Sequence, residues 1–286
     1  MANTTISSTS AQTYATIYYI HHKSHIHRGQ AFMPGGPQPI EHEQRLNLAR
    51  EIADKALEVR GEDLPAIGLY GSIARGTDGP CSDIEILCVL NTFDEDYDYE
   101  WVHGPWKAEI NFLSKNVLLA KAAEVDERWS LTHGAFCHVL TLHDPHHFFA
   151  TLRDVVLSQP QEHFIAAIRD CIIFNSYEMM GKLRNAHHSQ NTAYFPVIAL
   201  HMTTYGACII GLANRCHYTT ASHIHQESLT LPNRPAGYDE LCHLVMSGDL
   251  RDSQHIYDLC ETFWSGIEQW ATEKGVTFEE KRKIPF

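Results

Sequence analysis

Two carboxylates, Asp83 and Glu85, lie within an otherwise apolar run, where burying an acid is unfavourable unless a cation pairs with it. In a β-strand, residues i and i+2 point to the same face, so both acids project together while Ile84 and Ile86 face the other way. Two like charges this close repel, and one takes up a proton unless a cation intervenes. Because Mg²⁺ prefers oxygen ligands, the pair predicts a magnesium site, and the alternative is a strand end whose acids are simply hydrated.

A glycine turn precedes these acids and could hold an anion. Gly71 and Ser72 follow the apolar stretch AIGLY and open a short helical pattern, SIAR. Backbone N–H groups at a strand-to-helix junction bind anions, glycine lets a phosphate approach closely, and Ser72 and Arg75 add donors. The turn matches neither the Walker A pattern nor the dinucleotide-binding G-x-G-x-x-G pattern. Together, the turn and the acids predict a site for a metal–polyphosphate complex.

A third carboxylate, Glu109, follows Lys107 by two residues in the stretch WKAEINF, so the two side chains share a strand face. If this strand neighbours the one that carries Asp83, Glu109 points into the same site. Three carboxylates could then hold two Mg²⁺ ions, the arrangement used for in-line phosphoryl and nucleotidyl transfer.

The elements that must position these residues follow from hydrophobic periodicity. Short apolar stretches predict strands over residues 66–70, 84–90 and 106–113. Helical spacing predicts helices over residues 41–60, 114–128, 145–157, 161–187, 194–214, 238–247 and 252–273. Because strands fill the first half and helices the second, the pattern predicts an α+β fold, in which a small mixed sheet flanked by helices precedes a helical bundle.

Three parts of the chain are expected from this pattern. Residues 1–40 predict a poorly ordered extension, because they are rich in Ser, Thr, His, Pro and Gly. An α/β domain is expected over residues 41–157 and a helical domain over residues 158–286. The cleft between two such domains is the usual place for a small-molecule site.

The bulk composition narrows the class of function. The 286-residue chain has a net charge of −13, which argues against gripping a nucleic-acid backbone and suits a cationic partner, although acidity can also serve solubility alone. No apolar run approaches the ~20 residues of a membrane span, and no signal-peptide pattern opens the chain. The eight cysteines are scattered without C-x-x-C spacing, which is typical of reduced thiols. We therefore expect a cytoplasmic protein with no nucleic-acid or membrane partner.

The sequence resembles a known family at the same residues. Gly71-Ser72, ten intervening residues and then Asp83-Ile84-Glu85 form the signature of the polymerase-β-like nucleotidyltransferases. Within them, the chain is similar to the kanamycin nucleotidyltransferase family of aminoglycoside 4′-O-nucleotidyltransferases over about residues 43–286. Besides the opening stretch, the likeness rests on EWVHGPWKAEINF, LTHGAF, GKLRN, CHYTTAS, GYDELCHLVMSG and KRKIPF. It implies an N-terminal nucleotidyltransferase domain followed by a helical domain.

The resemblance also implies roles for residues at matching positions. The turn residues Gly71, Ser72 and Arg75 would contact the phosphates of ATP, which serves as co-substrate. Three strand carboxylates would ligate magnesium, namely Asp83, Glu85 and Glu109.

A helical pair would complete the site. Glu178 would act as general base on the sugar hydroxyl, and Lys182 would contact the phosphates. Without the resemblance, this i, i+4 pair indicates only a surface ion pair. The side chains expected to contact the antibiotic are Glu100, Lys107, Glu109 and Glu178. The family enzymes are dimers whose sites lie between subunits, so the resemblance implies a homodimer.

The acidic run DEDYDYEW, residues 94–101, fits a polycationic substrate. A loop with five carboxylates could neutralise ammonium groups and steer the ligand inward, with Glu100 in contact. The alternative is a solvated hairpin loop.

The implied reaction moves AMP from Mg-ATP to an aminoglycoside hydroxyl, the 4′ position, with release of pyrophosphate. It would confer antibiotic resistance, because a bulky anion on the drug spoils its RNA binding. Two alternatives remain open: a nucleotidyltransferase that acts on a macromolecule, and a non-catalytic nucleotide-binding sensor. Replacing Asp83 by Ala separates catalysis from sensing, because only catalysis requires the metal carboxylate.

Overall fold

The structure is a computed structural model that describes residues 35–91 and 97–284. Pro37–Phe286 form one compact unit. The predicted extension over residues 1–40 therefore lies mostly outside the described part, and every contact discussed below lies within the compact unit.

Five strands form one mixed sheet in the order β3-β4-β2-β1-β5. They are β1 (Ala66–Leu69), β2 (Ile84–Leu90), β3 (Tyr97–His103), β4 (Trp106–Ser114) and β5 (Leu140–His143). The central pair of β2 and β4 is parallel, and the other three pairs are antiparallel. The three predicted strands and the small mixed sheet are confirmed.

Sequence periodicity missed β3 and β5. The interpretation of residues 94–101 as a loop is wrong for Tyr97–Trp101, which belong to β3, whereas residues 94–96 lie outside the described residues. β3 is an edge strand and nearly all of its side chains are exposed, so it lacks the apolar alternation of a half-buried strand. β5 has only four residues, which is too short to show a period.

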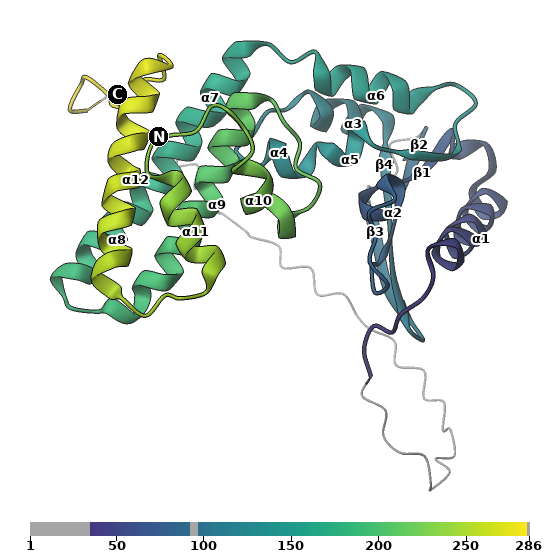
Figure 1. Cartoon of the computed structure of the whole chain (residues 1–286). Coiled ribbons are helices and arrows are strands. Elements are labelled where there is room, and N and C mark those ends of the chain that lie inside the picture. The colour runs from purple at the N-terminus through teal and green to yellow at the C-terminus, as the bar shows by residue number, and fades with distance from the viewer. Residues whose placement is uncertain (1–34, 92–96, 285–286) are drawn as a thin grey trace, which may run out of the picture. The chain divides into compact units, whose positions relative to one another are not determined.

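One face of the sheet is covered by the first helix, α1 (His42–Arg60), as Figure 1 shows. The helix begins with a capping box between Glu41 and Gln44 and ends at Gly61. Its buried stripe packs on every second residue of the strands, as the period of two requires. The core between helix and sheet includes Leu46, Ala49, Ile67, Ile84, Ile86 and Phe112.

The other face of the sheet joins the core of the helical region. Ala66, Leu87 and Val89 point to this side and belong to one apolar cluster with residues of the helices. Because Glu85 lies two residues before Leu87, its side chain lies on this second face, away from α1. The candidate site residues of the strands therefore face the helical region.

The seven predicted helices are present, whereas three short helices, over residues 129–132, 134–137 and 224–228, were not predicted. The helices after α1 are α2 (Gly71–Arg75), α3 (Lys115–Ala123), α4 (Trp129–Thr132), α5 (Gly134–Cys137), α6 (Phe148–Leu157), α7 (Gln161–Cys171), α8 (Glu178–His188), α9 (Phe195–Asn214), α10 (Ile224–Ser228), α11 (Tyr238–Ser247) and α12 (Ser253–Glu273). The helix predicted over residues 114–128 ends early, at Ala123. α9 packs against α7, α8, α11 and α12, so the C-terminal helical region is confirmed. The domain limits at residues 41, 157 and 158 stay predictions.

The long helix predicted over residues 161–187 contains a π-helical segment, Ile172–Tyr177, between α7 and α8. Such wide turns are uncommon and frequently lie at functional sites. Here the segment ends directly before Glu178, the residue that the resemblance nominates as general base. It also changes which side chains of the helix face inward: Ser176 is completely buried, while Tyr177 is exposed.

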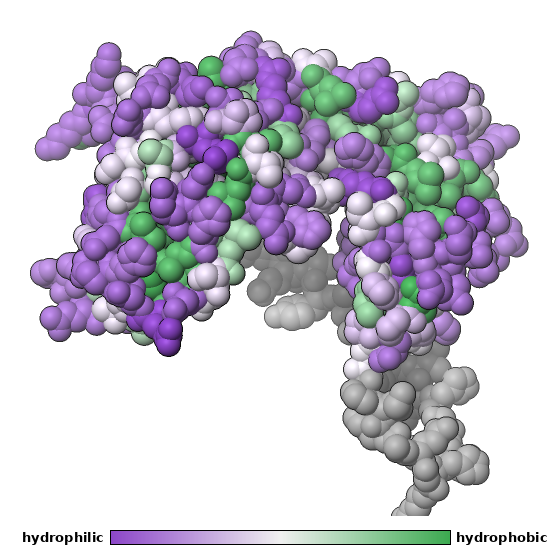
Figure 2. Space-filling model, viewed as in Figure 1, coloured by the Kyte–Doolittle hydropathy of each residue, from purple (hydrophilic) through white to green (hydrophobic). Residues whose placement is uncertain are grey.

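The expectation of no membrane-length apolar run needs a correction. One helix, Thr192–Asn214, is long and apolar enough to cross a membrane by length and composition. Within the protein, 67% of that apolar window is buried, because α9 is surrounded by other helices. Most residues of α9 belong to the apolar core of the helical region. Hydrophilic residues cover most of the molecular face drawn in Figure 2.

A buried ion pair ties α1 to the loop that leads into β2. Arg45, only 2% exposed, donates to the carboxylate of Asp78 through Nε and Nη2, and through Nη1 to the carbonyls of Ile40 and Pro80. His42 Nδ1 lies 2.7 Å from the second oxygen of the same carboxylate. The pair therefore fixes the chain between the glycine turn and Asp83.

Candidate active site

Three acidic side chains form one row across the sheet. β2 pairs with β4 so that Glu85 is opposite Glu109, and β3 pairs with β4 so that Glu100 is also opposite Glu109. Residues directly opposite one another share a face of the sheet, so the three carboxylates project to the same side. Asp83 precedes β2 by one residue and lies two residues from Glu85. The parallel register of β2 and β4 thus brings together the strand acids that the sequence singled out.

The Glu85 carboxylate lies against the glycine turn. A Cβ on Gly71 would fall 1.7 Å from Glu85 Oε2 and would clash with it. Gly71 also has a φ of +71°, which residues with a side chain rarely adopt. Burial, together with the negative charges of Asp83 and Glu109, raises the pKa of Glu85 to about 7. Arg75 and Lys107 offset only part of this shift. The arrangement holds more negative charge than its own cations neutralise.

Lys107 links Glu100, at the exposed end of the row, to Asp83, which lies beside the row. Its Nζ lies 3.0 Å from Glu100 Oε2 and 3.7 Å from Asp83 Oδ2. The three side chains are 39%, 50% and 40% exposed, and ion pairs this exposed contribute about 0–1 kcal/mol. A charged ligand can therefore replace either ion pair with little loss of free energy.

Glu109 is held by two neutral side chains that the sequence analysis did not single out. Tyr70 donates its hydroxyl to Glu109 Oε1 at 2.8 Å, and Asn111 Nδ2 donates both to that oxygen and, at 2.9 Å, to the Tyr70 hydroxyl. Burial and the neighbouring Glu109 raise the pKa of Tyr70, so Tyr70 stays protonated as a donor. Their places in the sequence carry a signal: Tyr70 directly precedes Gly71, and Asn111 lies two residues after Glu109 on the same strand face.

A cavity of about 210 Å³ between the sheet and α5 adjoins Tyr70, Glu109 and Asn111. Glu109 contributes a carboxylate to its wall, and the rest is partly apolar. The lining residues are Tyr70, Leu87, Glu109, Asn111, Leu113, Ala135 and Phe136. Space for a ligand thus lies directly beside the row of acids.

The turn residues lie at the start of α2. Gly71 and Ser72 are its first two residues, and Arg75 is its last. The Arg75 guanidinium does not point into open solvent: Nη1 donates to the backbone carbonyl of Thr219 at 2.6 Å, in the segment after α9. Its charge nevertheless acts on Glu85, whose pKa it lowers. Arg75 therefore lies near the carboxylates and is anchored to the helical region.

Glu178 and Lys182 form a 2.7 Å ion pair on α8. Both side chains are exposed, and α8 packs on α9 and α12. Among the described residues, no contact joins this pair to the carboxylates of β2 and β4 in the same chain. The structure therefore separates the predicted helical pair from the predicted metal ligands within one chain.

The residues Asp83, Glu85 and Glu109 fit a hard divalent cation in chemistry. All three supply oxygen ligands from one face of the sheet, and burial together with the charges of Asp83 and Glu109 raises the pKa of Glu85. As arranged in the described residues, no three His, Cys, Asp or Glu side chains already converge closely enough to hold a metal ion. Asp83 is drawn toward Lys107 and Glu109 toward Tyr70, so side-chain rotation would have to complete a coordination shell.

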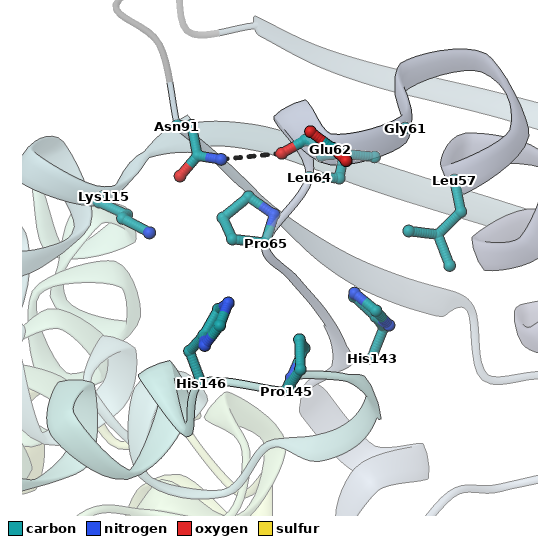
Figure 3. A pocket seen from close by; sticks show the side chains of 10 residues that line it. All are labelled: Leu57, Gly61, Glu62, Leu64, Pro65, Asn91, Lys115, His143, Pro145 and His146. Atoms are coloured by element: carbon teal, nitrogen blue, oxygen red, sulfur yellow. Dashed lines mark hydrogen bonds between the residues drawn. The ribbon is translucent and has the colours of Figure 1, made fainter.

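Another cavity, of about 660 Å³, lies at the opposite end of the strands (Figure 3). Its wall includes Pro65, which precedes β1, and Asn91, which follows β2. Lys115 and His146 point into it from the helical side, and Asn91 Nδ2 donates to the Glu62 carbonyl at 2.8 Å. Because Asp83 and Glu85 lie at the start of β2 and this cavity at its end, the cavity is separate from the row of acids.

Comparison with known proteins identifies close relatives. The KNTase C-terminal domain family matches residues 146–277. An aminoglycoside nucleotidyltransferase (4′) from a Bacillus species is 37% identical over 251 residues, which cover 88% of this chain and 99% of the relative. A protein of the same name from Staphylococcus aureus matches with the same identity and coverage.

A solved structure is also similar. It is a nucleotidyltransferase-like protein from Exiguobacterium sibiricum, with a TM-score of 0.49 and 10% sequence identity. The match covers 80% of this chain and 75% of that chain.

Proposed function

The chain belongs to the aminoglycoside nucleotidyltransferase (4′) family, and from that membership we propose that it transfers AMP from ATP to the 4′ hydroxyl of an aminoglycoside. Pyrophosphate leaves in the same step. The observation that carries the proposal is the row of Glu85 and Glu109 on adjacent parallel strands, beside a glycine turn that leaves no room for a side chain.

Asp83, Glu85 and Glu109 would hold magnesium, and three carboxylates on one face can serve two ions. Bound Mg²⁺ would supply charge neutralisation for the triphosphate and its leaving pyrophosphate. Support comes from the oxygen donor set and from the raised pKa of Glu85. The raised pKa means that Glu85 takes up a proton more readily when no cation is bound, so proton and metal would compete for its carboxylate oxygens.

The phosphates of ATP would be positioned by Gly71, Ser72, Arg75 and Lys182. Gly71 leaves space, and Ser72 adds a hydroxyl donor at the start of α2. The guanidinium of Arg75 has donors beyond the one that Thr219 occupies, and Lys182 adds a positive charge. Holding the reactants in line supplies much of the acceleration in such a reaction.

Glu178 would take the proton from the attacking 4′ hydroxyl. The hydroxyl oxygen forms a bond to the α-phosphorus, the bond to the pyrophosphate oxygen breaks, and the proton moves to a Glu178 oxygen. The exposed position of Glu178 supports this role, because a sugar can approach its carboxylate directly. Its ion pair with Lys182 would have to open for that approach.

The antibiotic would bind along the acidic face of the sheet. An aminoglycoside carries several ammonium groups, and Glu100 and Glu109 present carboxylates on one face. Lys107, which now pairs with Glu100, would yield this carboxylate to an ammonium group or bind a sugar hydroxyl. The chain's net charge of −13 adds long-range attraction for a polycation and argues against a nucleic-acid partner.

We place the complete site between two subunits of a homodimer. Glu178 and the strand carboxylates do not meet within one chain, so a partner's α8 would bring Glu178 to them. Apolar side chains exposed near Glu178 support an interface here, because such a patch favours contact with another protein surface. They are Phe174, Tyr177, Val197 and Leu200.

The test is a direct assay of the whole protein. We mix it with Mg-ATP and a panel that includes kanamycin and tobramycin, then measure pyrophosphate release and product mass. The expected product has gained one AMP residue, and chelation of Mg²⁺ abolishes its formation. Asp83→Ala should fold but fail to turn over. Absence of product with every aminoglycoside, or a product on an added protein or RNA, would refute the proposal.

A further inference from the structure

A chain of contacts joins Arg75 to a helix of the C-terminal region. Arg75 Nη1 donates to the Thr219 carbonyl at 2.6 Å, and the Thr219 amide donates to Glu227 Oε2 at 2.8 Å. Glu227 lies on α10, far along the sequence from α2. The backbone of Thr219 is thus held at its N–H by a carboxylate and at its C=O by a guanidinium.

The segment around Thr219 is anchored firmly. Tyr218, which is 1% exposed, donates its hydroxyl to the Ala207 carbonyl at 2.6 Å and its amide to the Ser130 carbonyl at 2.8 Å. A backbone carbonyl held this way offers a fixed acceptor. The Arg75 guanidinium therefore has one hydrogen bond whose position is set by the helical region and not by α2.

A second surface confines the other side of the guanidinium. Gly134, at the start of α5, has no side chain, and a Cβ there would lie 2.7 Å from Arg75 Nη2. The same Cβ would lie 3.3 Å from His217 Cβ, so it could not move away from Arg75 without approaching His217. Glycine at this position leaves the space that the guanidinium occupies.

We propose that Glu227 and Gly134 are positioning residues that orient Arg75 for the phosphates of ATP. The proposal rests on the proposed function, in which Arg75 contacts those phosphates. Thr219 occupies one guanidinium donor, and the planar fork then fixes the directions of the remaining donors. Glu227 acts by holding the Thr219 peptide, and Gly134 by leaving room. A fixed guanidinium loses less conformational entropy when nucleotide binds.

The test compares variants in two backgrounds. In the wild-type background, Glu227→Ala and Gly134→Ala should each raise KM for Mg-ATP by about tenfold while KM for the aminoglycoside changes less than about twofold. Glu227→Gln keeps an oxygen acceptor for the Thr219 amide, so it should restore most of the ATP affinity. A general loss of packing would affect both substrates and would not be rescued by Gln.

The same changes are then made in Arg75→Ala, and ATP binding is measured by calorimetry as well as by turnover. If Glu227 and Gly134 act through the guanidinium, Glu227→Ala and Gly134→Ala should each weaken ATP binding by less than about twofold beyond the loss caused by Arg75→Ala alone. Additive losses would overturn the proposal. Gly134→Ala gives an independent answer should Glu227→Ala unfold, because its shortest contact, the one with Arg75 Nη2, disappears with the Arg75 side chain.

The outcome separates this inference from the proposed function. If the wild-type protein bound ATP but transferred no AMP to any aminoglycoside, the proposed function would fail while the calorimetric comparison stayed valid. If AMP transfer occurred but the two-background comparison were additive, only the positioning role would fail.

Discussion

At Gly71, both the backbone conformation and the position of the Glu85 carboxylate disfavour a side chain. The φ of +71° already disfavours any other residue, and a Cβ would meet Glu85 Oε2 at 1.7 Å. Backbone strain at such a position costs about 1–2 kcal/mol, whereas the clash displaces a proposed metal ligand. The two effects can be separated by a control glycine, Gly76, which follows the last residue of α2.

We expect Gly71→Ala to lower kcat/KM at least about a hundredfold, because it moves the Glu85 carboxylate. Gly76→Ala is the matched control: Gly76 has a φ of +66° but nothing within 4 Å of the added Cβ. It should lose about 1 kcal/mol of stability and keep most of its activity. Steady-state pyrophosphate release and thermal melts measure the two quantities. Equal activity losses in both variants would show that strain alone matters.

At the scale of elements, α1 is fastened to the loop before β2 by the buried pair of Arg45 and Asp78. Burial alone would raise the pKa of Asp78, but hydrogen bonds from Arg45 and His42 outweigh it, so its pKa is lowered. A carboxyl whose pKa is lower in the folded state stabilises the fold above its unfolded pKa. That stabilisation is lost as the pH falls through the folded value.

We expect Arg45→Ala to lower the free energy of unfolding by about 3–5 kcal/mol at pH 7, because it leaves a buried carboxylate with only His42 as a partner. Urea denaturation measures the change. The deficit should shrink below about pH 4, where Asp78 takes up a proton. Lys55→Ala is the control: its pair with Glu58 lies on the same helix, but both side chains are at least 67% exposed. It should lose about 1 kcal/mol or less. A deficit that persisted unchanged at pH 3 would rule out the ion pair as its cause.

The edge strand β3 is expected to contribute substrate affinity through Glu100. Glu100→Gln should raise KM for the aminoglycoside about tenfold and leave KM for ATP nearly unchanged, because it removes one partner of an ammonium group. Asp98→Asn removes a charge from the same face of the same strand, but opposite Asn111 and farther from Asp83. Steady-state kinetics with each substrate varied in turn measures both constants. Equal effects of the two variants would indicate a diffuse charge effect and no specific contact.

At the scale of the whole molecule, the proposed site needs strands from one subunit and α8 from another. Asp83→Ala and Glu178→Ala should each be inactive alone. Random exchange of their subunits gives mixed dimers in which one of two sites is intact, so about a quarter of wild-type activity should return. Turnover after mixing, with mixed dimers verified by mass spectrometry, measures this. Mixed dimers without activity would place both residues in one subunit's site.

Much of this architecture is local and was therefore predictable. Alternation fixed the shared face of Asp83 and Glu85, and the 3.6-residue period predicted α1, α9 and α12 closely. The edge strand β3 was not predicted, because its side chains are exposed on both faces and show no burial pattern. The roles of Tyr70 and Asn111 were not predicted, because the contact between Tyr70 and the strand that carries Glu109 and Asn111 forms only when the sheet assembles.

The sequence by itself determined the acids, their spacing, the glycine turn and the family motif, because each is a property of neighbouring residues. Tertiary structure alone decided that Glu109 stands opposite Glu85, that Thr219 holds Arg75, and that Glu178 lies apart from the strand acids in one chain. The physical reason is that strand register and helix docking depend on contacts between residues far apart in the chain. No periodicity along a single segment encodes those contacts.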